Sequence, residues 1–302
     1  MTVGLIGLGR MGLGIAERLV RGGHGVVAFD LNAESRSAAA KLGARTVARA
    51  ADLPASLPEP RIVWLMIPAG PAVDKVLFDG PDALAATLAA GDIVIDGGNS
   101  NHNDSRQRAE RMAGANLTYL DCGTSGGVEG ASIGYCLMVG GPVEAYRRVE
   151  PALRSIAAPD GYAHVGPSGA GHFVKMIHNA IEYGLLQVIG EGFSLLAESP
   201  YDVDLAQAAD LWTHGSVIRS WLMELARTAL TRPDHFERIA PKAGGGSTGT
   251  WAVEEASRLG VDVPAIALSL TQRTGTPANE FAARMVAALR YEFGRHAFET
   301  TE

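Results

Sequence analysis

Short apolar, β-branched runs alternate with amphipathic, alanine-rich stretches over the first half of the chain. This alternation predicts strands separated by helices, as in a parallel sheet. The predicted strands are residues 3–6, 25–30, 61–67, 92–96 and 118–121. Helical periodicity then dominates from about residue 168, and the predicted helices are residues 173–198, 205–213, 218–231, 250–259 and 279–293. The pattern predicts an α/β domain followed by an all-α C-terminal domain.

A glycine-rich segment, Gly-Pro-Ser-Gly-Ala-Gly at residues 166–171, interrupts both periodicities. Such a break predicts a boundary, so we expect domains of residues 1–165 and 166–302. A chain of 302 residues is long enough for two domains with buried cores. Further breaks fall at residues 50–60, which are proline-rich, and 243–249, which are glycine-rich.

Composition narrows the class of protein. The chain is 47% hydrophobic and 20% charged, the balance of a soluble globular protein. A net charge of −7 without a long basic run disfavours nucleic acid as a partner. We expect neither a leader peptide nor a membrane span, because no basic leader precedes an apolar stretch and no apolar run approaches the ~20 residues that span a bilayer. With only Cys122 and Cys136 present, we expect a cytoplasmic protein without disulfides or membrane contact.

A glycine pattern directly follows the first predicted strand. It reads Gly7-Leu8-Gly9-Arg10-Met11-Gly12. Glycines at this spacing let the backbone turn tightly and approach a pyrophosphate, which the N-terminus of the next helix can bind. A glycine-rich turn without a ligand is the alternative. The strand, turn and helix in this order predict a Rossmann-type dinucleotide-binding domain.

Asp30 indicates which dinucleotide is bound. It ends the second predicted strand about 20 residues after the glycine pattern, where a carboxylate accepts hydrogen bonds from ribose hydroxyls. The carboxylate repels the additional phosphate of NADP, and the neighbouring Leu31 carries no positive charge. We therefore expect NAD in preference to NADP. The predicted cofactor site also includes Met66, Ile67 and Pro68, around the end of the third predicted strand.

The helix predicted from residue 173 carries an amine and an acid two turns apart. Lys175 and Glu182 project from one face, with His178 and Asn179 on the stripe between them. A desolvated lysine can act as a base and a desolvated glutamic acid as an acid, which suits proton transfer beside hydride transfer. A solvated face with ion pairs is the alternative. No metal is expected, because no third ligand accompanies His178 and Glu182 at a suitable spacing.

Several runs stand in a fixed order along the chain. They are residues 7–12, Ile95-Asp96-Gly97-Gly98-Asn99-Ser100, Ser125-Gly126-Gly127-Val128-Glu129-Gly130, residues 175–183 and Phe293-Gly294-Arg295-His296. Together they resemble 6-phosphogluconate dehydrogenase, within the β-hydroxyacid dehydrogenases. The resemblance covers almost the whole chain, and the length is similar to the family's short form, which lacks a second block of helices.

The resemblance implies a role for each site residue. Lys175 would take the proton of the substrate 3-hydroxyl during hydride transfer, and Glu182 would protonate the enediol left after CO2 departs. The residues implied to hold substrate beside the nicotinamide are Asn99, Ser125, Gly126 and Gly127, with His178 and Asn179 placing its carboxylate and hydroxyls. Asn99 is also assigned to the cofactor site. Ordinary turn chemistry is the alternative for both glycine runs.

The implied phosphate-binding positions are Tyr183, Thr248, Arg273, Arg290 and His296. The last two belong to a C-terminal tail that in this family reaches a neighbouring subunit, which implies a homodimer or homotetramer. Gly246 stands where the longer enzymes have a lysine. Three explanations remain open: Lys242 substitutes for it, fewer charges hold the phosphate, or the substrate differs.

We therefore expect NAD-dependent oxidative decarboxylation of 6-phosphogluconate to ribulose 5-phosphate, a reaction of the pentose phosphate pathway and of gluconate utilisation. One alternative is an NAD-dependent dehydrogenase of an unphosphorylated sugar acid or small 3-hydroxy acid. Another is a non-catalytic NAD-binding protein. Glu182 favours decarboxylation over the first alternative, and the pairing of Lys175 with Glu182 argues against the second.

Overall fold

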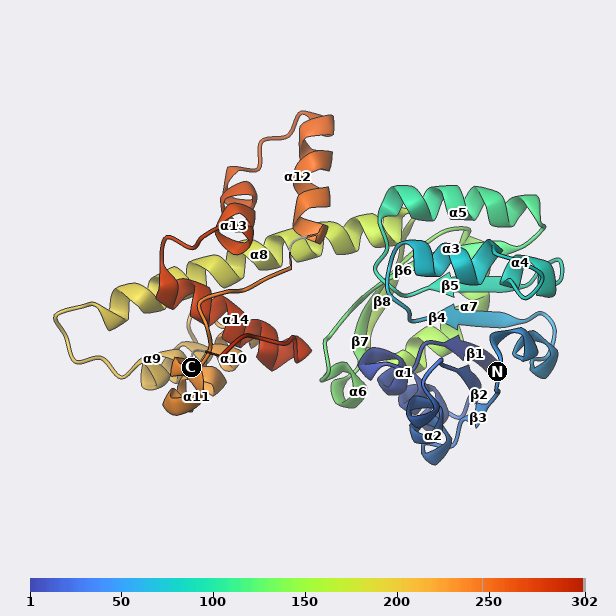
Figure 1. Ribbon diagram of the computed structural model, residues 1–302, viewed down its shortest axis with the longest axis horizontal. Helices are drawn as coiled ribbons and strands as arrows, with labels where there is room; N and C mark the ends of the chain where they lie inside the picture. Colours follow the sequence, from blue (N-terminus) through green and yellow to red (C-terminus); the bar gives the residue numbers. More distant parts are fainter. Residues whose placement is uncertain (246, 301–302) are drawn as a thin grey trace. The chain divides into compact units, whose positions relative to one another are not determined.

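The computed structural model describes residues 1–245 and 247–300. The chain divides into two compact units, Met1–Met176 and Ile177–Glu302 (Figure 1). The predicted division into domains of residues 1–165 and 166–302 stays a prediction. Over the described part of the chain, no helix combines the length and apolar character needed to cross a membrane.

The first unit is built on a mostly parallel sheet. In the described residues its eight strands follow the order β3-β2-β1-β4-β5-β6-β7-β8. The strands are β1 (Thr2–Ile6), β2 (Gly25–Phe29), β3 (Arg45–Thr46), β4 (Ile62–Leu65), β5 (Ile93–Asp96), β6 (Thr118–Ser125), β7 (Tyr135–Gly140) and β8 (Ala157–Gly166). Neighbouring strands are parallel except β6 and β7. The predicted Rossmann-type α/β class is confirmed.

Helices cover both faces of this sheet (Figure 1). They are α1 (Arg10–Arg21), α2 (Ala33–Lys41), α3 (Pro71–Phe78), α4 (Leu84–Thr87), α5 (His102–Gly114), α6 (Gly130–Ile133) and α7 (Val143–Ile156), with 3₁₀ turns at Ala50–Asp52 and Pro54–Ser56. Along β4, Ile62 and Trp64 pack in the core with α1, α2 and α7, whereas Val63 and Leu65 pack with α3, α4 and α5. Because both faces are buried, the central strands read as continuous apolar runs.

The sequence pattern did not predict β7 and β8, and it ended β6 too early. β6 runs on to Ser125, beyond the predicted end at residue 121. In the structure Gly123 lies inside the strand, where a Cβ would overlap Lys175 of the following helix. The glycine therefore serves close packing of a helix on the strand.

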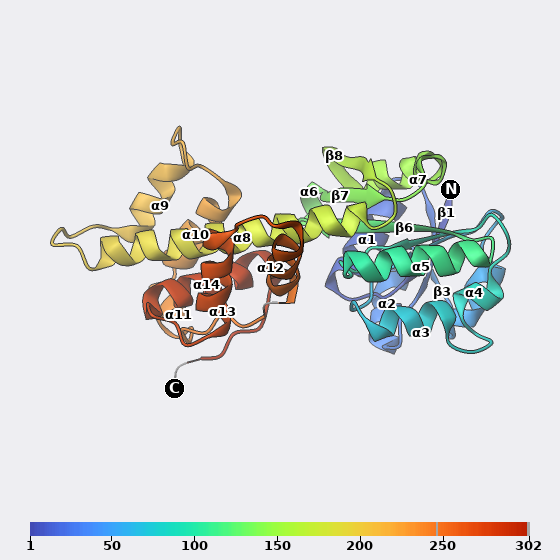
Figure 2. The ribbon, with the colours of Figure 1, turned by 90° about the horizontal axis from the view of Figure 1, so that it is seen from above.

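The second unit is helical. Its helices are α8 (Ala170–Ala197), which begins in the first unit, and α9 (Leu205–Thr213), α10 (Trp221–Leu230), α11 (Pro233–Glu237), α12 (Ser247–Leu259), α13 (Pro264–Thr274) and α14 (Glu280–Gly294) (Figure 2). Residues 285–289 of α14 are buried without interruption, so this helix is covered on several sides. α13 was not predicted, since Ser269 is its one buried residue and it lacks an apolar stripe.

Candidate functional site

The glycine turn after β1 has the geometry of a pyrophosphate-binding loop. Gly7 has φ +97°, and a Cβ there would overlap the carbonyl oxygen of Met66. A Cβ at Gly12 would overlap the carbonyl oxygen of Gly7. Gly9 faces open space among the described residues and precedes the exposed Arg10 at the start of α1, without a side-chain cap. The first N–H groups of α1 are thus available to an anion.

Asp30 follows β2 and ties this turn to the strand. Its Oδ2 accepts a hydrogen bond of 2.6 Å from the N–H of Leu8, and its Oδ1 accepts one of 2.7 Å from Asn32. Each oxygen keeps further acceptor capacity for ribose hydroxyls. The side chain of Leu8 is buried and that of Met11 packs on the same core, whereas Leu31 is 91% exposed. Leu8 therefore reaches a ligand only through its backbone.

Two further loops follow β4 and β5. Met66 and Ile67 lie against Gly7, since a Cβ there would come within 2.8 Å of Ile67 Cγ2 and overlap Met66; the exposed Pro68 comes next. Asn99 has φ +56°, a conformation that asparagine adopts more readily than most residues. Its Nδ2 donates to the carbonyl of Thr124 at 3.1 Å, and its Oδ1 accepts from the N–H of Thr124 at 2.9 Å.

These loops lie at one edge of the sheet. β2, β1, β4 and β5 are neighbours and parallel, so the residues that follow them meet at the carboxyl ends of the strands. The chain order reverses between β1 and β4, which is where open α/β sheets bind ligands. The residues assigned to the cofactor from the sequence are thus brought together, and their geometry fits a dinucleotide.

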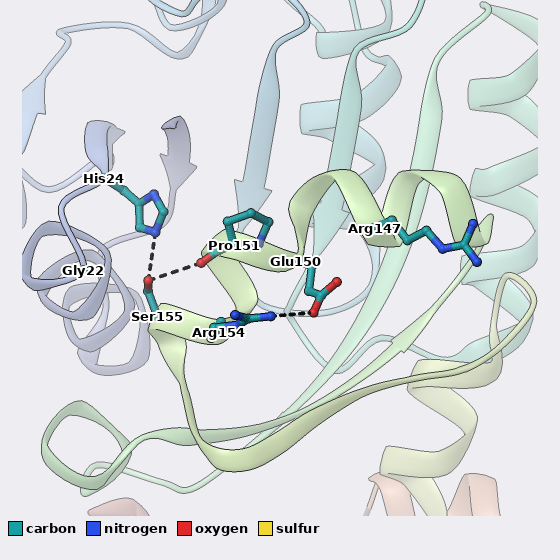
Figure 3. A pocket seen from close by; sticks show the side chains of 7 residues that line it. All are labelled: Gly22, His24, Arg147, Glu150, Pro151, Arg154 and Ser155. Atoms are coloured by element: carbon teal, nitrogen blue, oxygen red, sulfur yellow. Dashed lines mark hydrogen bonds and ion pairs between the residues drawn. The ribbon is translucent and has the colours of Figure 1, made fainter.

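A surface cavity of about 360 Å³ lies elsewhere on this unit (Figure 3). Its lining residues are Gly22, His24, Arg147, Glu150, Pro151, Arg154 and Ser155. Gly22 directly follows α1 and Gly25 begins β2, so the cavity lies at the amino ends of the strands, away from the glycine turn. Arg154 pairs with Glu150 at 3.0 Å and Arg147 with Glu144 at 2.7 Å. Since both arginines are paired, this cavity does not resemble an anion site.

Lys175 lies on α8 over strand β6. It is 6% exposed, and its Cβ lies where a side chain at Gly123 would extend. Gly123 directly precedes Thr124, the partner of Asn99, and β6 ends at Ser125. The next residues, Gly126 and Gly127, have φ of +127° and +56°. Lys175 therefore packs on the same strand, β6, that leads into the predicted substrate loop.

The same helix carries the other predicted catalytic groups. Glu182 is seven residues after Lys175 on α8, or roughly 10 Å along its axis. Between them, His178 Nδ1 lies 3.1 Å from Asn179 Oδ1. Glu182, His178 and Asn179 are all partly exposed, whereas Lys175 is buried.

Four of the five predicted phosphate residues meet in the second unit. The hydroxyls of Tyr183 and Thr248 lie 3.3 Å apart. The guanidinium carbon of Arg273 lies 3.7 Å from the centre of the Tyr183 ring, a cation–π arrangement. Arg290 Nη2 lies 3.0 Å from the position of a Cβ on Gly245. We call Tyr183, Thr248, Arg273 and Arg290 the arginine cluster.

Both guanidinium groups of the arginine cluster are short of partners. Arg273 Nε donates to the carbonyl of Gly244 at 3.1 Å, but Arg273 Nη1 and Arg290 Nε are buried without a hydrogen-bond partner among the described residues. Burial lowers the pKa of Arg273 to about 10 and also lowers the pKa of Arg290. An unpaired buried donor costs about 1–3 kcal/mol, more when charged. A bound anion would remove this cost for both groups.

Arg290 lies within the last helix rather than in the tail beyond it, and its predicted reach into a neighbouring subunit stays a prediction. Arg290 lies in α14, beside Arg273 of its own chain, because residues 285–289 anchor that helix in the core. His296 lies beyond α14, exposed, with its ring 5.9 Å from that of Phe293. Lys242, one of the three explanations for the missing lysine, pairs with Glu299 at 2.7 Å. Gly246 itself lies outside the described residues.

Sequence reasoning missed the residues that shape the loop beside the arginines. Gly244 and Gly245 have φ of +60° and +70°, and this backbone places the Gly244 carbonyl on Arg273 and makes room for Arg290. The run of glycines at residues 243–249 predicts a break in periodicity but by itself no contact with either arginine. A glycine run just before a hydroxyl residue assigned to phosphate, Thr248, was the available signal.

Comparison with known proteins places both units. Residues 2–169 match the NAD binding domain of 6-phosphogluconate dehydrogenase, and residues 171–280 match the 6-phosphogluconate dehydrogenase C-terminal domain. The NAD(+)-dependent, decarboxylating 6-phosphogluconate dehydrogenase of Haloferax volcanii is 49% identical over 299 residues, covering 98% of each chain.

Solved structures agree with this result. The Plasmodium falciparum 6-phosphogluconate dehydrogenase superposes with a TM-score of 0.82 at 27% identity, over 97% of this chain and 63% of its own. A 3-hydroxyisobutyrate dehydrogenase of Salmonella typhimurium superposes with a TM-score of 0.77 at 22% identity, over 94% of this chain and 99% of its own. The second likeness shows the fold alone.

Proposed function

The chain belongs to the 6-phosphogluconate dehydrogenase family, and we propose that it oxidises and decarboxylates 6-phosphogluconate with NAD, giving ribulose 5-phosphate and CO2. The observation that carries the choice of substrate is the arginine cluster, where each of two partly buried guanidinium groups has a buried nitrogen without a hydrogen-bond partner among the described residues. Guanidinium forks suit phosphate oxygens. Comparing turnover of 6-phosphogluconate with that of gluconate tests this proposal.

Lys175 has the first chemical role in this proposal. NAD, when bound at the glycine turn, supplies the hydride acceptor. The Lys175 amine takes the proton of the substrate 3-hydroxyl as that carbon is oxidised, leaving a β-keto acid. Lys175 is 6% exposed, so water has little access to the amine. Asn99 and the Ser125-Gly126-Gly127 loop, on or beside β6, hold the substrate against it.

Decarboxylation follows from the ketone. The bond between carbons 1 and 2 breaks, CO2 leaves, and its electron pair moves toward the carbonyl oxygen, which the protonated Lys175 stabilises. Glu182 then gives a proton to the enediol carbon that had carried the carboxylate, carbon 2 of the acid, which becomes carbon 1 of the ketose. His178 and Asn179, on the helix between the two, place the carboxylate and hydroxyls. No step of this chemistry requires a metal ion.

An unphosphorylated sugar acid or a small 3-hydroxy acid stays the second candidate substrate, because one residue expected to bind phosphate is missing. The longer enzymes have a lysine where this chain has Gly246. We favour the phosphorylated substrate since Arg290 stands next to Arg273 and supplies a second charge within the same chain. Of the three explanations for the missing lysine, phosphate held by fewer charges is therefore the one we propose.

The assembly and setting of the protein are part of the proposal. Residues 1–165 serve as the NAD-binding domain and residues 166–302 as the substrate-binding, catalytic and oligomerisation domain of a cytoplasmic homodimer or homotetramer. Exposed apolar side chains recur along one stripe of α8 at Ile181, Leu185, Val188 and Leu195. A stripe at this spacing supports helix packing between subunits, with His296 in the tail completing a neighbouring site.

Asp30→Ala is expected to weaken NAD binding by roughly 10- to 100-fold, because about two charge-assisted hydrogen bonds to ribose are lost. NADP should bind more readily than before, since the repulsive carboxylate is gone. Isothermal titration with each dinucleotide measures both effects. Glu34→Ala, which removes a neighbouring carboxylate at the start of α2, is the control and should change neither affinity. Equal losses in the two variants would exclude a specific role for Asp30.

Glu182→Gln is expected to lower kcat by about 10²- to 10⁴-fold, the usual contribution of a general acid. NAD affinity should stay unchanged because the glycine turn is untouched. CO2 release and NADH formation, followed together, measure the effect. Glu191→Gln, on the same helix and bonded to Gln187, is the matched control. Wild-type turnover by Glu182→Gln would remove this residue from the mechanism.

A further inference from the structure

The helix that carries Lys175 begins without a capping side chain of its own. α8 starts at Ala170, so the residue before it is Gly169, which has no side chain to accept a hydrogen bond. The first N–H groups of a helix lack partners within the helix. Gly171 and His172, in this first turn, are buried. The start of α8 is therefore closed to solvent and needs an acceptor from elsewhere.

Asp121 of β6 supplies that acceptor. Its Oδ1 accepts from the N–H of Gly169 at 2.7 Å, and its Oδ2 accepts from the N–H of His172 at 2.9 Å. These are the two N–H groups that a capping box serves with two different side chains. The Asp121 carboxylate is 0% exposed, and the positive end of the helix dipole compensates its charge.

Glycines let the helix come this close to the sheet. A side-chain carbon at Gly171 would overlap the carbonyl oxygens of Asp121 and Met138. A side-chain carbon at Gly140, on β7, would lie 2.7 and 2.9 Å from the two carboxylate oxygens of Asp121. Gly123 makes the same room for Lys175. The approach of α8 to β6 and β7 is thus fixed by the backbone as well as by the carboxylate.

We propose that Asp121 is a positioning residue for Lys175. Lys175 lies one turn beyond His172, and it rests on Gly123, two residues after Asp121 on the same strand. β6 also carries Thr124, the partner of Asn99, and ends at Ser125. By capping α8, the carboxylate fixes where the amine stands relative to the residues assigned to the substrate. This inference deepens the proposed function, because it rests on Lys175 being the base.

Asp121→Asn tests the proposal against a control of equal burial. The asparagine has no charge, and its amide NH₂ must face one of the two backbone N–H groups, of Gly169 or His172, that the carboxylate accepts from. Asp92→Asn is the comparison: Asp92 is 1% exposed and accepts from the backbone N–H groups of Arg61 and Ala89 at 2.6 and 2.9 Å, but it also pairs with Arg61 Nη1 at 3.1 Å and lies at the amino end of β5. Both variants should lower the melting temperature.

Asp121→Asn is expected to lower kcat by about ten-fold or more while KM and NAD affinity change by less than about three-fold, since a misplaced base affects the chemical step. Asp92→Asn should keep kcat within about two-fold. Equal kcat in the two variants would overturn the proposal. If Asp121→Asn does not fold, Asp121→Glu, which keeps the charge and moves it by one methylene, should show the same reduction in kcat without a change in KM.

Hydrogen exchange separates this inference from the proposed function. Amides of residues 169–175, followed by mass spectrometry, should exchange faster in Asp121→Asn than in wild type. In Asp92→Asn the exchange rate of these amides should not change. This measurement does not depend on enzyme turnover. If the wild-type protein does not turn over 6-phosphogluconate, the proposed function is wrong, but the capping role of Asp121 can still be tested. If hydrogen exchange is unchanged in Asp121→Asn, Asp121 does not cap α8.

Discussion

Lys175→Met is expected to reduce NADH formation by at least about 10³-fold, within the range lost when a general base is removed. Methionine is close to lysine in length and is apolar. It should therefore be tolerated at this position, where the residue is 6% exposed and packs against Gly123. The residues of the glycine turn do not change, so NAD should bind as in wild type. Stopped-flow absorbance measures the hydride step, and isothermal titration measures NAD affinity.

Lys75→Met is the control for this experiment. Lys75 lies exposed on α3, outside the predicted site residues, and its replacement removes the same charge. It should keep wild-type kcat and NAD affinity. Retained turnover in Lys175→Met would exclude Lys175 as the base. Loss of NAD binding in the same variant would instead indicate a damaged fold.

Arg273→Met is expected to lower kcat/KM for 6-phosphogluconate by roughly 10²- to 10³-fold, since about two charge-assisted hydrogen bonds to phosphate are lost. Most of the loss should fall on KM, because the phosphate is remote from the reacting carbons. Arg290→Met should have a similar effect, since its guanidinium shares the loop at Gly244 and Gly245. Steady-state kinetics with 6-phosphogluconate measures both variants.

Arg284→Met provides the matched comparison for the two arginine variants. Arg284 also lies on α14, where its Nε donates to the carbonyl of Ile239 at 2.9 Å and its guanidinium carbon lies 6.0 Å from the Phe236 ring centre. Like Arg273, it donates to a backbone carbonyl and lies near an aromatic ring, but it is not part of the arginine cluster. KM should stay near the wild-type value in this variant. Unchanged KM in Arg273→Met as well would show that phosphate binds elsewhere.

The parts of the site that the sequence predicted are local in the chain. The glycine turn, Asp30 and the stripe from Lys175 to Glu182 follow from periodicity and fixed spacing, because strand, turn and helix geometry relate neighbours in sequence. The positive φ of Gly7 and the continuous helix α8 agree with those patterns. What each residue binds stays a prediction.

The parts that the sequence could not predict depend on distant contacts. Asp121 caps a helix that starts 49 positions later, counted from residue 121 to residue 170, and no local signal links the two. The glycine at position 123 likewise carries no local signal that Lys175 of a distant helix packs on it. Arg290 was assigned to a tail, since the sequence alone does not show that α14 is anchored beside Arg273. Each of these pairings forms only when distant segments of the same unit have folded together.

The most direct test of the account is NADH formation by the purified protein with 6-phosphogluconate and with gluconate, in the presence of EDTA, with CO2 release followed in parallel. We predict selective turnover of the phosphorylated acid, one CO2 for each NADH, and no inhibition by EDTA. Turnover of gluconate alone, or NADH without CO2, would contradict this prediction. Turnover of gluconate alone would identify a dehydrogenase of unphosphorylated acids, and the glycine at position 246 would explain why phosphate is not bound. NADH without CO2 would identify a dehydrogenase that does not decarboxylate.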